Sequence, residues 1–143
     1  MPDRAAILAR WFGARLEPQD GGASLLVERR IPLDASVEAR LATLPPTAYF
    51  DTETTGLSTG AGTVIFLAGI AGREGDAMVV RQYLLPDYPH ERPLLRAVAA
   101  TLTSAARLVT YNGRTFDLPL LATRLTVNGM FAEQSALAAV HDD

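Results

Sequence analysis

Hydrophobic and polar positions alternate along the chain with two different periods, and their order predicts a mixed α/β fold. Apolar residues recur four positions apart between Asp3, a candidate cap, and Gly13, which predicts a short amphipathic helix over residues 3–12. Asp34 is positioned to cap a second helix, which the proline pair at 45–46 ends. Both signals are local, so they predict helices whatever the rest of the chain does.

Short β-type runs separate these helices from two more in the C-terminal half. The glycine-containing turn GREGD predicts that the runs 64–71 and 77–85 form an antiparallel hairpin. Apolar residues at helical spacing predict a helix over 94–102, and another from about residue 116 to Asn128-Gly129, followed by a last strand. The expected strands before that point cover residues 23–31, 48–52, 64–71, 77–85 and 107–111.

Three strands in succession and then strand–helix units predict a mixed sheet: three antiparallel strands followed by βα units, with helices on both faces. We expect residues 1–46 to supply a helix, a strand and a helix that lead into a core domain of residues 47–143. A chain of 143 residues is long enough to bury about 68% of the surface that its unfolded form exposes.

Composition narrows the functional classes. Hydrophobic residues make up 48% of the chain and the formal net charge is -3, so a compact core is expected and a global basic field for nucleic acid is excluded. The absence of cysteine excludes disulfides and thiolate metal sites. With no 18-residue apolar run and no signal-peptide core, we expect a cytoplasmic protein that makes no membrane contact. The oligomeric state stays open.

The first candidate site is the stretch YFDTETTGLSTGAGTVIF, residues 49–66. In an extended chain Asp51 and Glu53 face the same way, and two carboxylates within about 4–6 Å oppose each other's ionisation. They mark either the solvated end of a strand, with an arginine nearby, or a cation site. The glycines that follow allow a backbone to approach a ligand closely, but the Gly-Lys-Ser/Thr sequence of a P-loop is missing.

The second candidate site is the stretch YNGRTFDLPLL, which begins at Tyr111, a residue to which we assign a structural role. Pro119 requires the helix to begin at about residues 115–118, so Asp117 lies near its N-cap. That aspartate either accepts backbone N–H bonds or is a rigidly held metal ligand. Phe116 is a core anchor or a stacking surface for a base. Arg114 is a phosphate ligand or a solvated loop arginine.

If the strands 48–52 and 107–111 are parallel neighbours, Asp51, Glu53 and Asp117 converge at one edge of the sheet. Three oxygen ligands favour Mg²⁺ or Mn²⁺. Two such ions about 3.5–4 Å apart can activate a water and stabilise the leaving oxygen of a phosphodiester. The spacing therefore permits metal-dependent phosphoryl chemistry without requiring it.

These motifs carry a family resemblance. FDTETTGL (50–57) resembles the first exonuclease motif of the DEDD superfamily of 3′–5′ exonucleases, which have the ribonuclease H-like fold. NGRTFDLPLL (112–121) resembles their second motif. The wider pattern LLVERR, VRQY and LVTYNG resembles YprB-like ribonuclease H-like proteins over residues from about 25 to 143.

The resemblance implies a two-metal nuclease that hydrolyses single-stranded DNA or RNA from a free 3′ end with Mg²⁺ or Mn²⁺. Asp51 would bridge the two ions, Glu53 would bind one of them and position the attacking water, and Asp117 would hold the second ion through water. Five further residues would contact the terminal nucleotide, with Leu57 against its base: Thr55, Gly56, Leu57, Asn112 and Phe116.

One part of the family pattern is missing. The superfamily has a third motif, on a later helix, with a fourth metal-binding aspartate preceded by a His or Tyr that orients the water. Here the chain ends soon after Asp117, and HDD (141–143) resembles the start of the family's fifth strand, with Asp143 in that place. We therefore expect a C-terminally short domain. It is either a metal-dependent exonuclease or a non-catalytic ribonuclease H-like module that binds nucleic acid or protein, or an inactive fragment of the enzyme.

Overall fold

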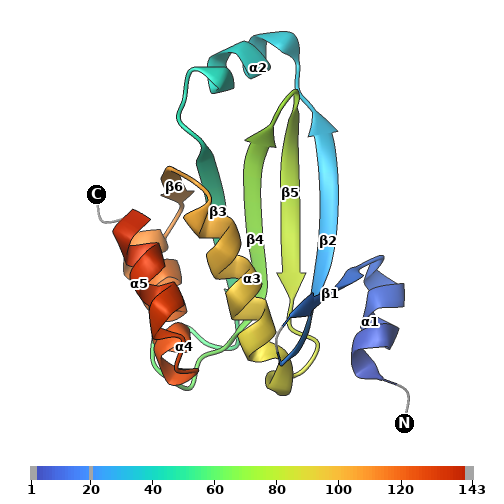
Figure 1. Ribbon diagram of the computed structural model, residues 1–143, viewed down its shortest axis with the longest axis vertical. Helices are drawn as coiled ribbons and strands as arrows, with labels where there is room; N and C mark the ends of the chain where they lie inside the picture. Colours follow the sequence, from blue (N-terminus) through green and yellow to red (C-terminus); the bar gives the residue numbers. More distant parts are fainter. Residues whose placement is uncertain (1–2, 20, 141–143) are drawn as a thin grey trace.

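The computed structural model describes residues 3–19 and 21–140, which form a six-stranded sheet with packed helices (Figure 1). The strands are β1 (Arg15–Gln19), β2 (Gly22–Pro32), β3 (Thr47–Thr54), β4 (Ile65–Glu74), β5 (Ala77–Leu84) and β6 (Arg107–Thr110). The α-helices are α1 (Arg4–Phe12), α2 (Ala35–Ala42), α3 (Glu91–Thr103), α4 (Leu118–Val127) and α5 (Phe131–Val140). A short 3₁₀ helix, η1 (Tyr88–His90), precedes α3, and a π-helical turn, η2 (Gly113–Asp117), precedes α4.

Strand pairing confirms the predicted mixed α/β sheet, which is consistent with a ribonuclease H-like fold. The strand order is β1-β2-β5-β4-β3-β6, and all neighbours are antiparallel except β3 and β6, which are parallel. The predicted hairpin joins β4 to β5, with Gly75 in its turn at φ 62°. Three sequential antiparallel strands are thus followed by a return through α3 to the parallel strand β6.

The edge strand β1 was not among the expected elements. Its sequence, RLEPQ, has no clear alternation and contains Pro18, which a central strand would not tolerate. It pairs with β2 across a tight turn in which Gly21 adopts a φ of 88°. The strand forms because every residue of β1 pairs with β2. This pairing is a tertiary contact, so the local sequence pattern does not reveal it.

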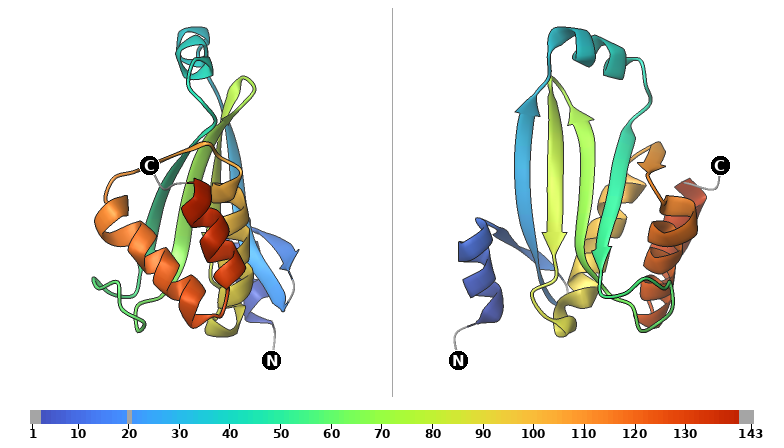
Figure 2. Two further views of the ribbon diagram at one scale, coloured as in Figure 1. Left: turned by 60° about the vertical axis from the view of Figure 1, so that its left-hand side comes forward. Right: turned by 180° about the vertical axis from the view of Figure 1, so that it is seen from behind.

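The helices cover the two faces of the sheet unequally. On one face α3, α4 and α5 pack over the sheet (Figure 1), and Phe50 and Val79 of that face are no more than 2% exposed. Seen from behind, the strands lie in front of α3, while α4 and α5 stand beside β3 (Figure 2), and outward residues such as Ala71 and Val80 are only half-buried. We expected helices on both faces. Over the described residues, α1 packs beside β1 and β2, but the middle of the second face carries no helix. This is because both helices that follow β6 return to the face that α3 already occupies.

The core lies between this sheet face and its three helices. Residues at helical spacing on α3 fill its centre, as predicted from the 94–102 pattern, and leucines of α4 pack beside them. Each of these residues is 0% exposed: Leu94, Leu95, Val98, Leu102, Leu120, Leu121 and Leu125. The fold is therefore held chiefly by apolar burial under α3 and α4.

The C-terminal segment forms α5, where we expected a strand. Its sequence, FAEQSALAAV, is rich in alanine with Glu and Gln, which favour helix, and it has a β-branched residue only at its end. Gly129, at φ 68°, and the bond from the Met130 amide to the Leu125 carbonyl (2.8 Å) end α4 and turn the chain back. Leu137 is then buried against the core. The predicted strand start at His141 and Asp143 lies outside the described residues.

The N-terminal segment belongs to the same sheet, because β2 pairs with β5. Asp34 caps α2 by accepting a hydrogen bond from the Ser36 amide (2.9 Å), as predicted. α2 stands at one end of the molecule (Figure 1), and each of its residues is at least partly exposed. The division at residue 46 stays a prediction. Among the described residues no helix has the length and apolar character needed to cross a membrane.

Candidate functional site

Asp51 and Glu53 lie at the carboxyl end of β3, and both are exposed. Because side chains alternate along a strand, both lie on the sheet face that lacks the helices, whereas Thr52 between them faces the helices. The neighbouring strand β6 ends opposite Phe50, so the two carboxylates lie just beyond it. Parallel pairing of these two strands, the condition for a shared site at their carboxyl ends, is confirmed.

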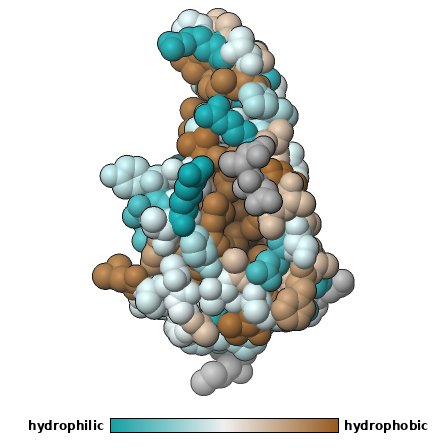
Figure 3. Space-filling model, turned by 90° about the vertical axis from the view of Figure 1, so that its left-hand side faces the viewer, coloured by the Kyte–Doolittle hydropathy of each residue, from teal (hydrophilic) through white to brown (hydrophobic). Residues whose placement is uncertain are grey.

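Asp51 forms part of a shallow, mainly apolar hollow on this face. The hollow spans β5, β4, β3 and β6, and its outward-facing lining also includes Tyr49, Gly69, Ala71, Val80, Val109 and Tyr111. Tyr111, to which we assigned a structural role, is 97% exposed. Figure 3 looks at the β6 edge of the molecule rather than at this face, and there too hydrophobic side chains lie between hydrophilic ones. The carboxylate pair therefore borders an apolar surface.

Asp117 is only 2% exposed and accepts a hydrogen bond from the Thr52 hydroxyl at 2.6 Å. It occupies the N-cap position of α4, as predicted, but its side chain makes no capping bond to the first turn of this described helix. The π-helical turn η2 carries it over the helix-covered side of β3. The contact with Thr52 thus takes the place of the backbone N–H bonds that were one of the two predicted roles of this aspartate.

The predicted convergence of the three acids is not present in this conformation. Over residues 3–19 and 21–140, no group of three or more acidic, histidine or cysteine side chains lies close enough together to hold a metal ion. The physical reason is strand alternation: Asp51 and Glu53 face one side of β3, and Thr52 draws Asp117 toward the other.

The turn that carries the second motif is tightly packed. A Cβ on Gly113 would lie 1.8 Å from the Thr110 hydroxyl, so only glycine fits there. The Asn112 carbonyl accepts bonds from the amides of Thr115 (3.2 Å) and Phe116 (2.9 Å), while the Asn112 residue as a whole is exposed. Phe116 is half-buried and packs against the core, which favours the core-anchor alternative for this ring.

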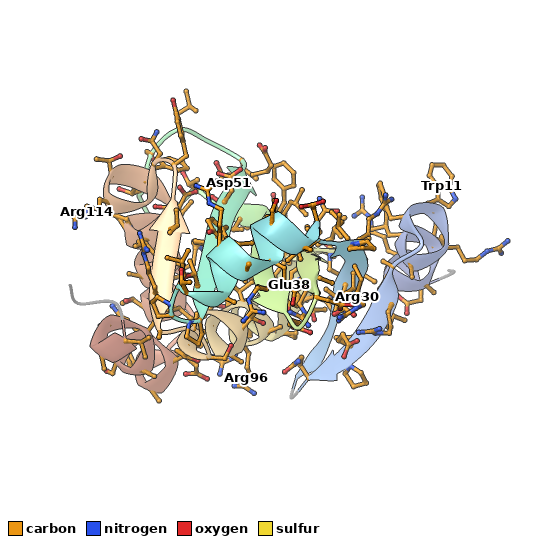
Figure 4. The ribbon with its side chains drawn as sticks, turned by 90° about the horizontal axis from the view of Figure 1, so that it is seen from above. Trp11, Arg30, Glu38, Asp51, Arg96 and Arg114 are labelled. Carbon is orange, nitrogen blue, oxygen red and sulfur yellow. The ribbon has the colours of Figure 1, made fainter. Side chains whose placement is uncertain are left out.

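Arg114, the candidate phosphate ligand of this turn, is exposed at the edge of the molecule and points away from Asp51 (Figure 4). That placement is typical of a solvated loop arginine. The surface next to Asp51 is therefore the apolar hollow and not a basic patch.

The loop after β3 is closed at its base and exposed at its tip. Thr55 and Val64 exchange two hydrogen bonds, from the Thr55 amide to the Val64 carbonyl and from the Val64 amide to the Thr55 hydroxyl, both 3.0 Å. The Gly56 carbonyl accepts a bond from the Thr54 hydroxyl at 2.7 Å. Leu57 is 98% exposed. The three predicted nucleotide-contacting residues of this loop, Thr55, Gly56 and Leu57, therefore lie in one ordered turn.

A buried ion pair beside this loop was not predicted from the sequence. Glu91 at the start of α3 and Arg124 on α4 are 8% and 6% exposed, and they are joined by two hydrogen bonds of 2.5 and 2.7 Å. The bonds to Glu91 raise the pKa of Arg124, against the opposite effect of burial. Arg124 also donates to the Ala61 carbonyl in the loop. Separations of 33 and 63 residues left no local pattern that could reveal this network.

Removing the Thr52 hydroxyl tests how firmly Asp117 is held. We expect Thr52→Val, which keeps the side-chain volume, to lower the free energy of unfolding by about 1–3 kcal/mol, because a buried carboxylate loses its donor. Thr52→Ser keeps the hydroxyl and should cost less. Denaturant unfolding compares the two. Equal stability of the valine variant and the parent chain would mean that water replaces the hydroxyl.

Comparison with known proteins agrees with this architecture. The model of the RNase H superfamily matches residues 48–139, which is more than half of the chain. A segment of 79 residues, 55% of this chain, is 46% identical to the "Uncharacterized protein YprB" of Bacillus subtilis (strain 168). The matched segment spans only 19% of that relative's length. With the parallel pairing of β3 and β6 and the motif at the end of β3, the superfamily match shows that the chain belongs to the RNase H superfamily, and part of it is similar to YprB.

Proposed function

We propose that this domain is a metal-dependent nuclease of the DEDD type, a 3′–5′ exonuclease that acts on single-stranded DNA or RNA. The observation that carries the proposal is the exposed pair Asp51 and Glu53, presented on one side of β3 beyond the end of β6. Membership of the RNase H superfamily supports a nuclease-type fold and nucleic acid as the partner. The glycine-rich loop, with Leu57 exposed, supports contact with a terminal nucleotide.

The donor set fits a hard divalent cation only in part. Asp51 and Glu53 are carboxylates on one exposed face, the ligand type that Mg²⁺ and Mn²⁺ prefer. Asp117 would join them only after its side chain leaves Thr52. A bound ion would neutralise the paired carboxylates and supply a Lewis acid for phosphodiester hydrolysis. Asp51 and Glu53 are thus the residues that would hold it first.

A second candidate is a non-catalytic ribonuclease H-like module that binds nucleic acid or protein, or an inactive fragment of an enzyme. The observation that favours it is the separation of Asp117 from the other two acids, with no three-acid group among residues 3–19 and 21–140. The two candidates share the same surface and differ in whether a bound strand is cleaved.

Labelled oligonucleotides distinguish the candidates. With Mn²⁺, we expect single-stranded DNA or RNA labelled at its 5′ end to give a ladder that shortens from the 3′ end. EDTA should abolish the ladder, and Glu53→Gln should slow it by about 100-fold or more. Glu38→Gln, a matched change on the distant helix α2, should leave the rate unchanged.

Cleavage that survives both EDTA and Glu53→Gln would contradict the proposed function. Binding of the labelled strand without cleavage, by a protein that is folded and retains Mn²⁺, would select the second candidate.

A further inference from the structure

The loop of residues 55–63 is tied together at several points. Its base is closed by the paired bonds between Thr55 and Val64. Inside it, the Thr63 amide donates to the Gly60 carbonyl (3.1 Å), and the hydroxyls of Thr63 and Ser58 are 3.1 Å apart. The tip, Gly60 to Gly62, is exposed and has two glycines, so these local bonds alone leave it free to move.

One long-range bond fixes the tip: Arg124 on α4 donates through Nη1 to the Ala61 carbonyl. The loop leaves the lower end of β3 and passes beneath α4 (Figures 1 and 2), so the helix is placed to hold it from above. Arg124 is 6% exposed, and a buried bond from a cation to a carbonyl is among the stronger ones a loop can have.

The guanidinium divides its donors between two partners. Nε and Nη2 bind the two carboxylate oxygens of Glu91, which leaves Nη1 for the loop. The Asn128 side-chain amide also donates to Glu91 (3.1 Å) and to the Arg124 carbonyl (2.9 Å), which fixes the pair from the end of α4. The bonds to Glu91 join α4 to α3 and do not involve the loop. The bond to Ala61 serves the loop and is therefore a separable role of the same side chain.

We propose that Arg124 is a positioning residue: through the Ala61 carbonyl it holds loop 55–63 in one conformation, so that Leu57 meets the terminal nucleotide. This inference rests on the proposed function. Leu57 is 98% exposed on a loop whose base is fixed by Thr55, and a flat apolar base is the part of a nucleotide that such a side chain can contact. Arg124 would touch neither substrate nor reacting atoms and would act through the loop alone.

Arg124→Lys separates the two roles. Lysine keeps a positive charge for Glu91, but its single ammonium cannot span Glu91 and Ala61 as the planar fork does. Glu91→Gln makes the opposite change, because it weakens the pair and leaves the bond to Ala61. The matched control is Arg30→Lys, at an exposed pair with Glu74 remote from the loop.

Two measurements that need no cleavage read out the loop. Hydrogen exchange at the Thr63 amide should be about 10-fold faster in Arg124→Lys, with exchange across β4 and β5 unchanged. In Arg124→Lys the Kd for a fluorescein-labelled oligothymidylate, measured by fluorescence anisotropy in the presence of Ca²⁺, should be about 5- to 10-fold higher than in the parent chain. Glu91→Gln and Arg30→Lys should leave both values as in the parent chain. If Arg124→Lys does not fold, Glu91→Gln/Arg124→Gln removes both buried charges and should show the same loosened loop.

The outcomes separate this inference from the proposed function. A parent chain that does not bind the oligothymidylate contradicts the proposed function for single-stranded DNA, and exchange at the Thr63 amide then still tests whether Arg124 holds the loop. A parent chain that binds, with equal Kd and equal Thr63 exchange in the Arg124 variants, overturns Arg124 as a positioning residue and leaves the proposed function standing.

Discussion

Replacing Glu91 with alanine is expected to lower the free energy of unfolding by about 3–5 kcal/mol. The change leaves the Arg124 guanidinium in a site that is 6% exposed, with the Ala61 carbonyl still accepting one bond and the carboxylate gone. An uncompensated buried cation costs far more than the pair contributes when both members are present. Denaturant unfolding monitored by circular dichroism would measure the loss.

Two controls give this result its meaning. Glu91→Met/Arg124→Met replaces the pair with apolar groups of similar length and should recover most of the loss, because no buried charge remains. Glu17→Ala breaks an ion pair with Arg15 on the edge strand β1, where Arg15 is exposed, and should cost less than about 1 kcal/mol. If Glu91→Ala lowers the free energy of unfolding by no more than Glu17→Ala does, water reaches the Glu91 site and the pair of Glu91 and Arg124 behaves as a surface ion pair.

The elements that could be predicted are those whose causes are local. Asp3 accepts a bond from the Ala5 amide (3.0 Å) and Gly13 adopts a φ of 62°, so the cap and the stop that define α1 are visible in its own sequence. The hairpin of β4 and β5 likewise follows from its turn. β1 was missed because a partner strand, not its own pattern, decides its form. The composition of α5 does favour a helix, and that local signal was overlooked.

The same distinction between local causes and contacts between elements applies to the candidate site. Period-two alternation correctly placed Asp51 and Glu53 on one exposed face. Chain spacing brought Asp117 close to β3 but could not give the direction of its side chain, which a hydroxyl 65 residues away determines. Glu91 and Arg124 meet only because α3 and α4 pack together. A sequence pattern specifies which residues share a face of one element, and contacts between elements decide what those residues bind.

Asp51→Asn is expected to separate stability from activity. Under the proposed function it should reduce Mn²⁺-dependent cleavage about 100- to 1,000-fold, because the ligand shared by the cations is lost. The fold in EDTA should be unchanged or slightly firmer, because the substitution relieves repulsion with Glu53 at an exposed position that the core does not use. The measurements are the cleavage rate and the melting temperature with and without Mn²⁺.

Stabilisation of the fold by bound Mn²⁺ tests the assignment of Asp51 as a metal ligand without a measurement of catalysis. An ion that binds only the folded parent chain stabilises it by about 2.7 kcal/mol at a free concentration 100 times its Kd, so Mn²⁺ should raise the melting temperature. Asp51→Asn should abolish that rise, and Asp76→Asn, an exposed aspartate in the β4–β5 turn, should retain it. Severe destabilisation by Asp51→Asn in EDTA would instead identify this carboxylate as a structural hydrogen-bond acceptor. A rise with Mn²⁺ that survives the substitution would place the ion elsewhere on the protein and refute the assignment of Asp51.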